Sequence, residues 1–191
     1  MSDSASIVLF DIKNHSHVTP YLAAIHGSCI THDRTIATFL PPLSHDKLLS
    51  WWKSCIAEIA EGSRVMFLLV DGMDPSGHIK GPEIMGVVML FMPSSETGPF
   101  RGSVQKLLVH KRFRGRSGAK LLMNALEAEA LRRQRTLLLL NTETGSPAEA
   151  IYKRLGYTEV GKVPNHGISP TGELKASTFF YKDISAQAHS D

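Results

Sequence analysis

Residues 104–123, Val-Gln-Lys-Leu-Leu-Val-His-Lys-Arg-Phe-Arg-Gly-Arg-Ser-Gly-Ala-Lys-Leu-Leu-Met, contain the end of an apolar strand, a basic turn and the start of a helix. The first turn of a helix has backbone N–H groups without intrahelical acceptors and the positive end of the helix dipole. Gly115 and Gly118 allow a tight bend and a close approach of a ligand to the backbone. The stretch therefore predicts an anion site at this turn. An ordinary turn with basic side chains is the alternative.

The hydrophobic pattern around this stretch predicts alternating strands and helices. We expect strands at 6–12, 64–71, 83–92, 102–110, 136–140, 157–162 and 176–184, with the apolar strand 136–140 covered on both faces. We expect helices within 18–30, from the N-cap Ser44 to Gly62, from Ala119 to about Gln134, and from the N-cap Ser146 to near Leu155. This order predicts an α/β fold, with a mixed sheet and helices on both of its faces.

Length and composition indicate one globular domain over residues 1–191, with frayed ends at 1–4 and 186–191. Hydrophobic residues make up 42% and charged residues 20%, as in ordinary soluble chains. The longest apolar stretch, 84–92, is far shorter than the ~20 residues of a membrane span. No secretory signal is recognisable, so we expect a cytoplasmic protein in which Cys29 and Cys55 are free thiols.

The positive charge is concentrated in the second half of the chain. Six basic residues lie between Lys106 and Lys120 with no acidic residue among them. Such a cluster fits a phosphorylated cofactor, a nucleic acid or a solvated surface. A nucleic-acid-binding module is the weakest of these hypotheses, because aromatic residues do not alternate with the basic ones as in single-strand binders.

The sequence lacks the motifs of several other functional classes. There is no G-x-x-x-x-G-K-[ST] and no G-x-G-x-x-G after the first strand, which argues against a P-loop hydrolase and a Rossmann dinucleotide site. The histidines at 15, 17, 26 and 32 have no cysteine or carboxylate at tight ligand spacing, so we predict no metal site.

Two motifs together resemble the GNAT superfamily of N-acetyltransferases. Arg114-Gly-Arg-Ser-Gly-Ala119 resembles its R-x-x-G-x-G/A signature, between an apolar strand and an amphipathic helix. Ala148, Tyr152 and the ending Leu155-Gly-Tyr157 resemble its second motif, about thirty residues later. Within the superfamily, residues 104–109, 141–146 and 178–182 are most similar to the tabtoxin-resistance type, which modifies a small toxin amine.

This sequence departs from both motifs at one position each. Ser117 stands where the signature has glycine, although Gly118 follows. A serine there can still present its N–H group if its φ stays negative. In the second motif, Gly145 replaces an asparagine, and Asn141 lies at the end of the preceding strand instead.

The resemblance implies a mostly antiparallel sheet in which two central parallel strands, here 103–109 and 136–141, splay apart to admit acetyl-CoA. The pantetheine arm would pair with the backbone near Leu107, Leu108 and Val109, and a backbone N–H near Val109 would polarise the acetyl carbonyl. The implied cofactor-binding residues are Leu107, Leu108, Val109, Arg114, Gly115, Arg116, Ser117, Gly118, Ala119, Lys120 and Ala148.

The implied reaction is direct transfer of the acetyl group to a primary amine. Glu143, just past the second of these strands, is the candidate base, with a solvated loop acid as the alternative. Asn141 would orient the amine or a water molecule. Tyr152, one helical turn after Ala148, would protonate the departing thiolate, unless it is only packed beneath its helix.

The sequence does not identify the acceptor of the acetyl group. We expect a small-molecule amine, with a protein or peptide amine as the alternative, and a CoA-binding protein without catalysis as a further one. Homodimers formed through the last strands are common in this superfamily, and membrane or nucleic-acid partners are not expected. Trp52 is expected in the core, while Trp51 and His166 are candidates for the wall of the acceptor pocket.

Overall fold

The structure, a computed structural model, describes residues 5–34, 36–72 and 79–186. Most of the loop expected between the two strands at 64–92 lies outside these residues, as do nearly all of the ends expected to be frayed. Among the described residues, no helix is long and apolar enough to cross a membrane.

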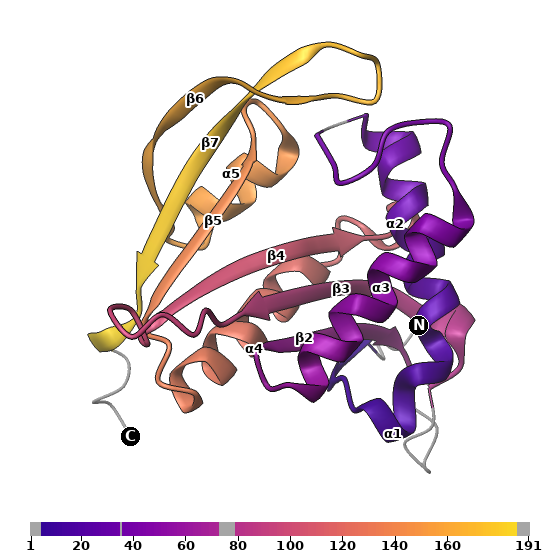
Figure 1. Cartoon of the computed structure of the whole chain (residues 1–191), viewed down its shortest axis with the longest axis horizontal. Coiled ribbons are helices and arrows are strands. Elements are labelled where there is room, and N and C mark those ends of the chain that lie inside the picture. Colours follow the sequence, from indigo (N-terminus) through magenta and orange to yellow (C-terminus); the bar gives the residue numbers. More distant parts are fainter. Residues whose placement is uncertain (1–4, 35, 73–78, 187–191) are drawn as a thin grey trace.

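The chain forms seven strands and five α-helices in the described residues (Figure 1). The strands are β1 (Ala5–Leu9), β2 (Arg64–Asp71), β3 (Ile84–Phe91), β4 (Arg101–Val109), β5 (Leu137–Glu143), β6 (Thr158–Ile168) and β7 (Leu174–Asp183). The helices are α1 (Ile12–His15), α2 (Thr19–Asp33), α3 (His45–Ala60), α4 (Gly118–Arg132) and α5 (Pro147–Arg154).

All seven strands belong to one sheet, in the order β1-β2-β3-β4-β5-β7-β6. Only β4 and β5 are parallel, and they pair solely through Arg101–Ser103 and Leu137–Leu139. Beyond this short ladder the two strands diverge (Figure 1). The predicted fold class, a mixed and mostly antiparallel sheet with a splayed central parallel pair, is therefore confirmed.

Helices cover both faces of the sheet. One core packs α4 and α5 against the sheet through residues such as Leu122, Leu126 and Tyr152. The other packs α2 and α3 against the opposite face through residues such as Leu22 and Trp52. Trp52 is fully buried, as predicted.

A register shift in β4 changes which side chains face each core. The β3–β4 ladder is irregular between Val87 and Met89, and opposite this point Lys106 has a φ of 54°. Such a bulge puts an extra residue in one strand and redirects its side chains. Leu107 and Val109 pack against the α4–α5 core, whereas Leu108 packs against the α2–α3 core.

The helix caps follow from local chemistry. Ser44 accepts a hydrogen bond from the Lys47 N–H at 3.3 Å and caps α3, as predicted. Ser146 occupies the N-cap position of α5, but its side chain makes no capping bond. Glu149 accepts from the Gly145 N–H instead, which satisfies a backbone donor at the start of α5.

Three sequence expectations differ from the structure. The first strand, expected at 6–12, is β1 and ends at Leu9, and Ile12 already begins α1. β5 is not covered on both faces, since Leu138 is buried while Leu139 is 37% exposed. β6 extends to Ile168, well past the strand expected at 157–162, because backbone pairing with β7 resumes at Gly167 and Ile168 after an irregular stretch. Apolar character alone does not distinguish a strand buried on both faces from one buried on a single face.

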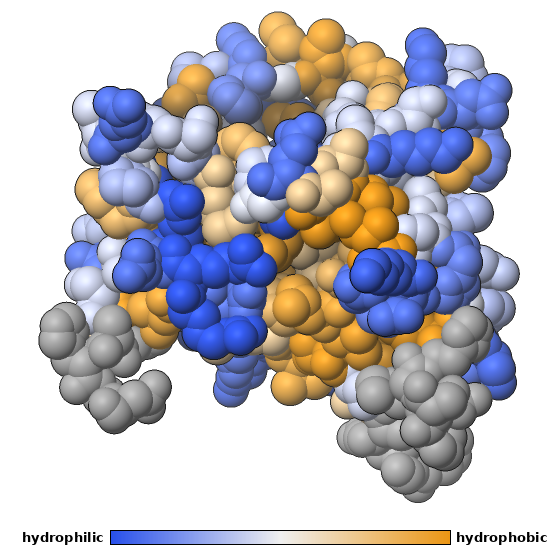
Figure 2. Space-filling model, turned by 60° about the horizontal axis from the view of Figure 1, so that its bottom comes forward, coloured by the Kyte–Doolittle hydropathy of each residue, from blue (hydrophilic) through white to orange (hydrophobic). Residues whose placement is uncertain are grey.

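The face of the molecule drawn in Figure 2 shows a hydrophobic area between groups of hydrophilic side chains. Apolar surface is normal on folded proteins, so this area does not by itself indicate a partner.

We predict that Gly86→Ala destabilises the fold. A Cβ atom at Gly86 would lie 2.7 Å from the Leu108 carbonyl oxygen, and backbone cannot move aside cheaply. The free energy of unfolding in urea should fall by about 1–3 kcal/mol. Gly161→Ala is the matched control, because nothing lies within 4 Å of its added Cβ atom. Equal stability of the two variants would contradict the close packing of β3 on β4.

Candidate functional site

A cavity of about 1320 Å³ opens where β4 and β5 diverge. Its lining comes from α2, α3, β4, the turn before α4, the start of α4, β5 and α5. All the predicted cofactor residues except Arg116 line it, and so do Asn141, Glu143 and Tyr152. The splay thus brings together residues that lie as far apart as 107 and 152 in the sequence.

The N-terminus of α4 supplies free donors to this cavity. The first intrahelical bond runs from the Leu121 N–H to the Ser117 carbonyl at 3.0 Å. The N–H groups of Gly118, Ala119 and Lys120 therefore precede the ladder and have no intrahelical acceptor. With the dipole of a 15-residue helix behind them, they form an anion site.

Ser117 adopts a strained backbone conformation at this turn. Its φ is 59°, in the left-handed region that serine disfavours and that glycine adopts without steric cost. The condition that φ stays negative is therefore not met. The signature loop keeps the conformation of a glycine at this position although the side chain is present.

The edge of β4 that faces the splay presents backbone groups that no neighbouring strand pairs. His110 donates its N–H to the Met85 carbonyl at 2.8 Å, which fixes the alternation of the β3–β4 ladder. Neighbouring residues in an antiparallel ladder point their N–H and C=O groups to opposite sides. The N–H and C=O of Val109 consequently point away from β3, toward the space that β5 leaves.

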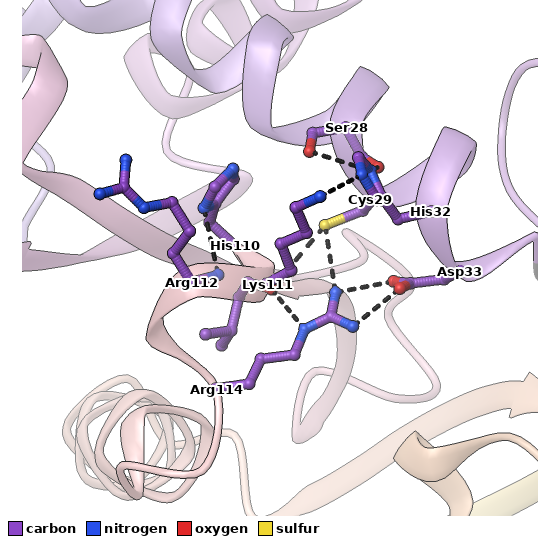
Figure 3. Close-up of polar contacts among 9 residues, drawn as sticks. Ser28, Cys29, His32, Asp33, His110, Lys111, Arg112 and Arg114 are labelled. Carbon is purple, nitrogen blue, oxygen red and sulfur yellow. Dashed lines mark hydrogen bonds and ion pairs between the residues drawn. The ribbon is translucent and has the colours of Figure 1, made fainter.

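Arg114 occupies part of this edge (Figure 3). Its Nε donates to the Val109 carbonyl at 2.8 Å, and its two terminal nitrogens donate to the Asp33 carboxylate at 2.7 and 2.8 Å. The hydrogen bonds to Asp33 raise the pKa of Arg114, so its charge is permanent and already balanced. The side chain thus ties the turn to α2, and the anion site rests on the backbone and Lys120.

The same close-up shows a second link between α2 and the turn (Figure 3). Lys111 Nζ lies 2.5 Å from His32 Nε2. Of the basic run seen in the sequence, Lys111 and Arg114 therefore face α2, while Lys120 lines the cavity.

Tyr152 combines a buried ring with a place on the cavity wall. It is 6% exposed, and its ring centroid lies 5.8 Å from that of Tyr157 and 6.1 Å from that of Phe180. Burial raises the pKa of Tyr152 well above its ordinary value of 10. The phenol therefore keeps its proton at neutral pH, as a proton donor must.

Glu143 and Asn141 lie at the end of β5, on the far wall. Glu143 accepts a hydrogen bond from the Ile36 N–H at 2.7 Å, so this carboxylate also fixes the segment after α2. Asn141 is exposed and lines the same cavity.

Neither cysteine is activated as a nucleophile. Burial raises the pKa of both Cys29 and Cys55 to about 11. Both remain protonated thiols, which are weak nucleophiles. Among the described residues, no group of three or more His, Cys, Asp and Glu side chains is arranged to hold a metal ion.

Some predicted positions do not reach the cavity, and some lining residues were missed. Arg116 is exposed outside it, and His166 packs edge-on against Phe179 at 5.2 Å instead. Trp51 lines the cavity as predicted. His26 and Lys106 also line it, and neither was a candidate from the sequence.

Comparison with known proteins agrees with this geometry. Residues 75–159 match the family model of the acetyltransferase (GNAT) domain. The matched stretch contains both of the motifs recognised in the sequence and is similar to the GNAT acetyltransferase domain. The match confirms the recognition of the two motifs and indicates an N-acetyltransferase.

Solved structures with the same fold cover nearly the whole chain. A protein from Salmonella typhimurium that is provisionally assigned as an acetyltransferase, solved with its cofactor acetyl-CoA, has 17% identity and a TM-score of 0.69, over 95% of this chain and 94% of that one. A protein provisionally assigned as a phosphinothricin N-acetyltransferase has 14% identity and a TM-score of 0.73, over 95% and 99%.

The ribosomal L7/L12 α-N-protein acetyltransferase, solved with coenzyme A, has 17% identity and a TM-score of 0.73, over 97% of both chains. At these identities the likeness shows the fold alone. The relatives act on acceptors as different as a small molecule and a protein N-terminus, so the fold does not identify the acceptor.

We predict that the left-handed conformation of Ser117 makes this position sensitive to side-chain shape. A β-branched residue tolerates positive φ poorly, so Ser117→Val should lower the free energy of unfolding by about 1–2 kcal/mol. Ser117→Gly should not lower it, since glycine adopts this φ freely. Urea unfolding of both variants measures the difference, and equal losses would contradict the strain at this turn.

We predict that His26 makes the fold less stable at low pH. Burial, followed by the charge of Lys106, lowers the pKa of His26 from 6.5 to about 3. Below pH 6.5 the unfolded chain binds a proton that the folded chain does not. The free energy of unfolding therefore decreases as the pH is lowered. Through this residue, lowering the pH from 7 to 5 should reduce the free energy of unfolding by about 2 kcal/mol.

The measurement is urea unfolding of the wild type and of His26→Asn across this pH range. The variant lacks a titrating imidazole, so its stability should depend less steeply on pH. Parallel curves for the two proteins would show that His26 is not held neutral by the fold.

Proposed function

We propose that this protein transfers the acetyl group of acetyl-CoA directly to the primary amine of a small molecule. The observation that carries the proposal is the cavity between the diverging strands β4 and β5, which continues to the free N–H groups of α4. The single domain spans residues 1–191 in this proposal, and the cytoplasm is its compartment.

The residues present fit acetyl-CoA in three places. The backbone N–H groups of Gly118, Ala119 and Lys120 suit the pyrophosphate, with the Lys120 ammonium beside them. The edge of β4 at Leu107 suits the amides of the pantetheine arm, which would extend the sheet as a strand does. The Val109 carbonyl already accepts from Arg114. Ala148 leaves room beside α5 for the thioester end.

The reaction needs one oxyanion donor and two proton transfers. The Val109 N–H stabilises the negative charge that develops on the carbonyl oxygen when the amine attacks the carbonyl carbon. Glu143 takes the proton that the amine loses, directly or through water, while Asn141 orients the amine. Tyr152 gives its proton to the sulfur as the carbon–sulfur bond breaks, and solvent restores it.

The test is calorimetric titration with acetyl-CoA, followed by mass spectrometry of amines incubated with the enzyme and acetyl-CoA. We expect saturable binding of acetyl-CoA. At least one small amine should gain about 42 mass units, because an acetyl group replaces a hydrogen. Acetylation restricted to protein N-termini or peptides would favour the alternative acceptor class. Binding without any turnover would favour a CoA-binding protein, and no binding would overturn the proposal.

We predict that Tyr152→Phe lowers turnover more than it weakens acetyl-CoA binding. The substitution removes the hydroxyl proton but keeps the buried ring, so the cavity keeps its shape. A loss of about 10²–10⁴-fold in kcat is the range for removing a general acid. Steady-state kinetics and calorimetry measure the two effects, and an unchanged kcat would remove Tyr152 from the mechanism.

A further inference from the structure

The cavity has two ends, which lie on opposite faces of the sheet. The anion site at the start of α4 and the wall formed by Tyr152 belong to the α4–α5 face. The other end is lined by α2, α3 and the segment after α2, through residues such as Trp51 and Thr38. If the donor enters from the α4 end, as the proposed function has it, the acceptor occupies the end beside α2 and α3.

Lys106 is the cation of this acceptor end. Its Nζ donates to Thr38 Oγ1 at 2.5 Å and lies 5.1 Å from the centroid of the Trp51 ring. The bulge in β4 gives Lys106 a positive φ, which places the side chain toward α3. Holding a non-glycine residue in this conformation costs free energy, and such strain is often found at binding sites.

No carboxylate of the described residues compensates the charge of this lysine. Among the described residues, no ion pair joins Lys106 Nζ to an acidic side chain. Of the two carboxylates that line the cavity, Asp33 is bound by Arg114 and Glu143 accepts from the Ile36 N–H. The other cation nearby, Arg64, is paired with Glu58 at 2.6 Å.

An unpaired cation in a partly desolvated place favours the arrival of an anion. Burial lowers the pKa of Lys106, which means that the charged form is under-solvated there. A carboxylate beside Nζ would restore the lost stabilisation and form a charge-assisted hydrogen bond. A second positive charge on the acceptor would be repelled at the same place.

Few other groups at this end of the cavity would interact with the charge of a ligand. His26 is 1% exposed and, with its pKa lowered to about 3, is a neutral ring. Its Nδ1 has no hydrogen-bond partner, and its ring lies 5.4 Å from Trp51 and 5.7 Å from Phe39. Aromatic rings therefore form the apolar part of the wall, and Lys106 supplies its positive charge.

We propose that Lys106 binds a carboxylate of the acceptor, so that the amine acetylated by this enzyme belongs to an amino acid or a similar amino-carboxylate. This inference rests on the proposed function and specifies its substrate class. Lys106 acts in it as a specificity-determining residue that takes no part in the proton transfers. Polyamines and lysine-rich peptides are excluded as good acceptors by the same charge.

The test compares amines that differ only in the carboxylate. The twenty amino acids and their carboxamides are incubated with enzyme and acetyl-CoA, and kcat/KM is measured for each acid that reacts and for its amide. We expect the acid to be preferred at least tenfold (about 1.4 kcal/mol). An amide that is as good as its acid, or a panel in which no acid reacts, would overturn the proposal.

Variants locate this preference at Lys106. Lys106→Met removes the charge but keeps an unbranched apolar stem, so KM for the acid should rise at least tenfold while the amide is little affected. Lys106→Arg should restore part of the preference. Lys53→Met, an exposed lysine on α3, is the matched control and should change neither value. An equal loss for acid and amide in Lys106→Met would contradict the proposal.

A second measurement uses the wild-type protein alone. Trp51 lies beneath Lys106 Nζ, so a carboxylate that binds there should change tryptophan fluorescence in a saturable way. N-acetyl amino acids and their amides, added with coenzyme A, are the probes. A response to the acids alone supports the proposal, and an equal response to both contradicts it. Failure of acetyl-CoA to bind in calorimetry would instead overturn the proposed function.

Discussion

The three-residue ladder between β4 and β5 is the constraint on which the rest of the structure depends. Past Ser103 the strands separate, and the β4 backbone groups on that side have no strand to bond. A buried backbone group without a partner costs about 1–3 kcal/mol, so such an edge requires another donor or acceptor. Arg114 supplies one donor, to the Val109 carbonyl, and the Val109 N–H is left for a ligand. The splay thus creates both the cavity and the backbone groups with which a ligand would bond.

The second requirement is that the turn before α4 stays in place beside this edge. Arg114 and Lys111 connect the turn to Asp33 and His32 at the end of α2 (Figure 3). Ser117 keeps a left-handed backbone conformation at the start of α4 at some cost in free energy. Glu143 fixes the next segment, at Ile36. The donor end and the acceptor end are therefore connected through α2, although they lie on opposite faces of the sheet.

Local patterns in the sequence predicted most of the fold and the cofactor end of the site. The bounds of β2 were correct because Val, Leu and Phe fill it, and Ser44 marked the start of α3 through its capping chemistry. The length of β6 was not predictable, because its polar and turn-forming residues are held by pairing with β7. The role of Arg114 was missed because Asp33 lies 81 residues away in the sequence. Lys106 and His26 became neighbours only through the bulge in β4 and the packing of α2, which no local pattern encodes.

Hydrogen exchange with and without acetyl-CoA tests the central claim most directly. The claim is that the cofactor binds to the unpaired edge of β4 and to the free N–H groups of α4. It predicts slower exchange of the amides at 107–109 and 117–120 in the presence of acetyl-CoA, with β6 unchanged. Binding that leaves both of these segments exchanging at their original rates would show that the cofactor lies elsewhere, and would contradict the claim.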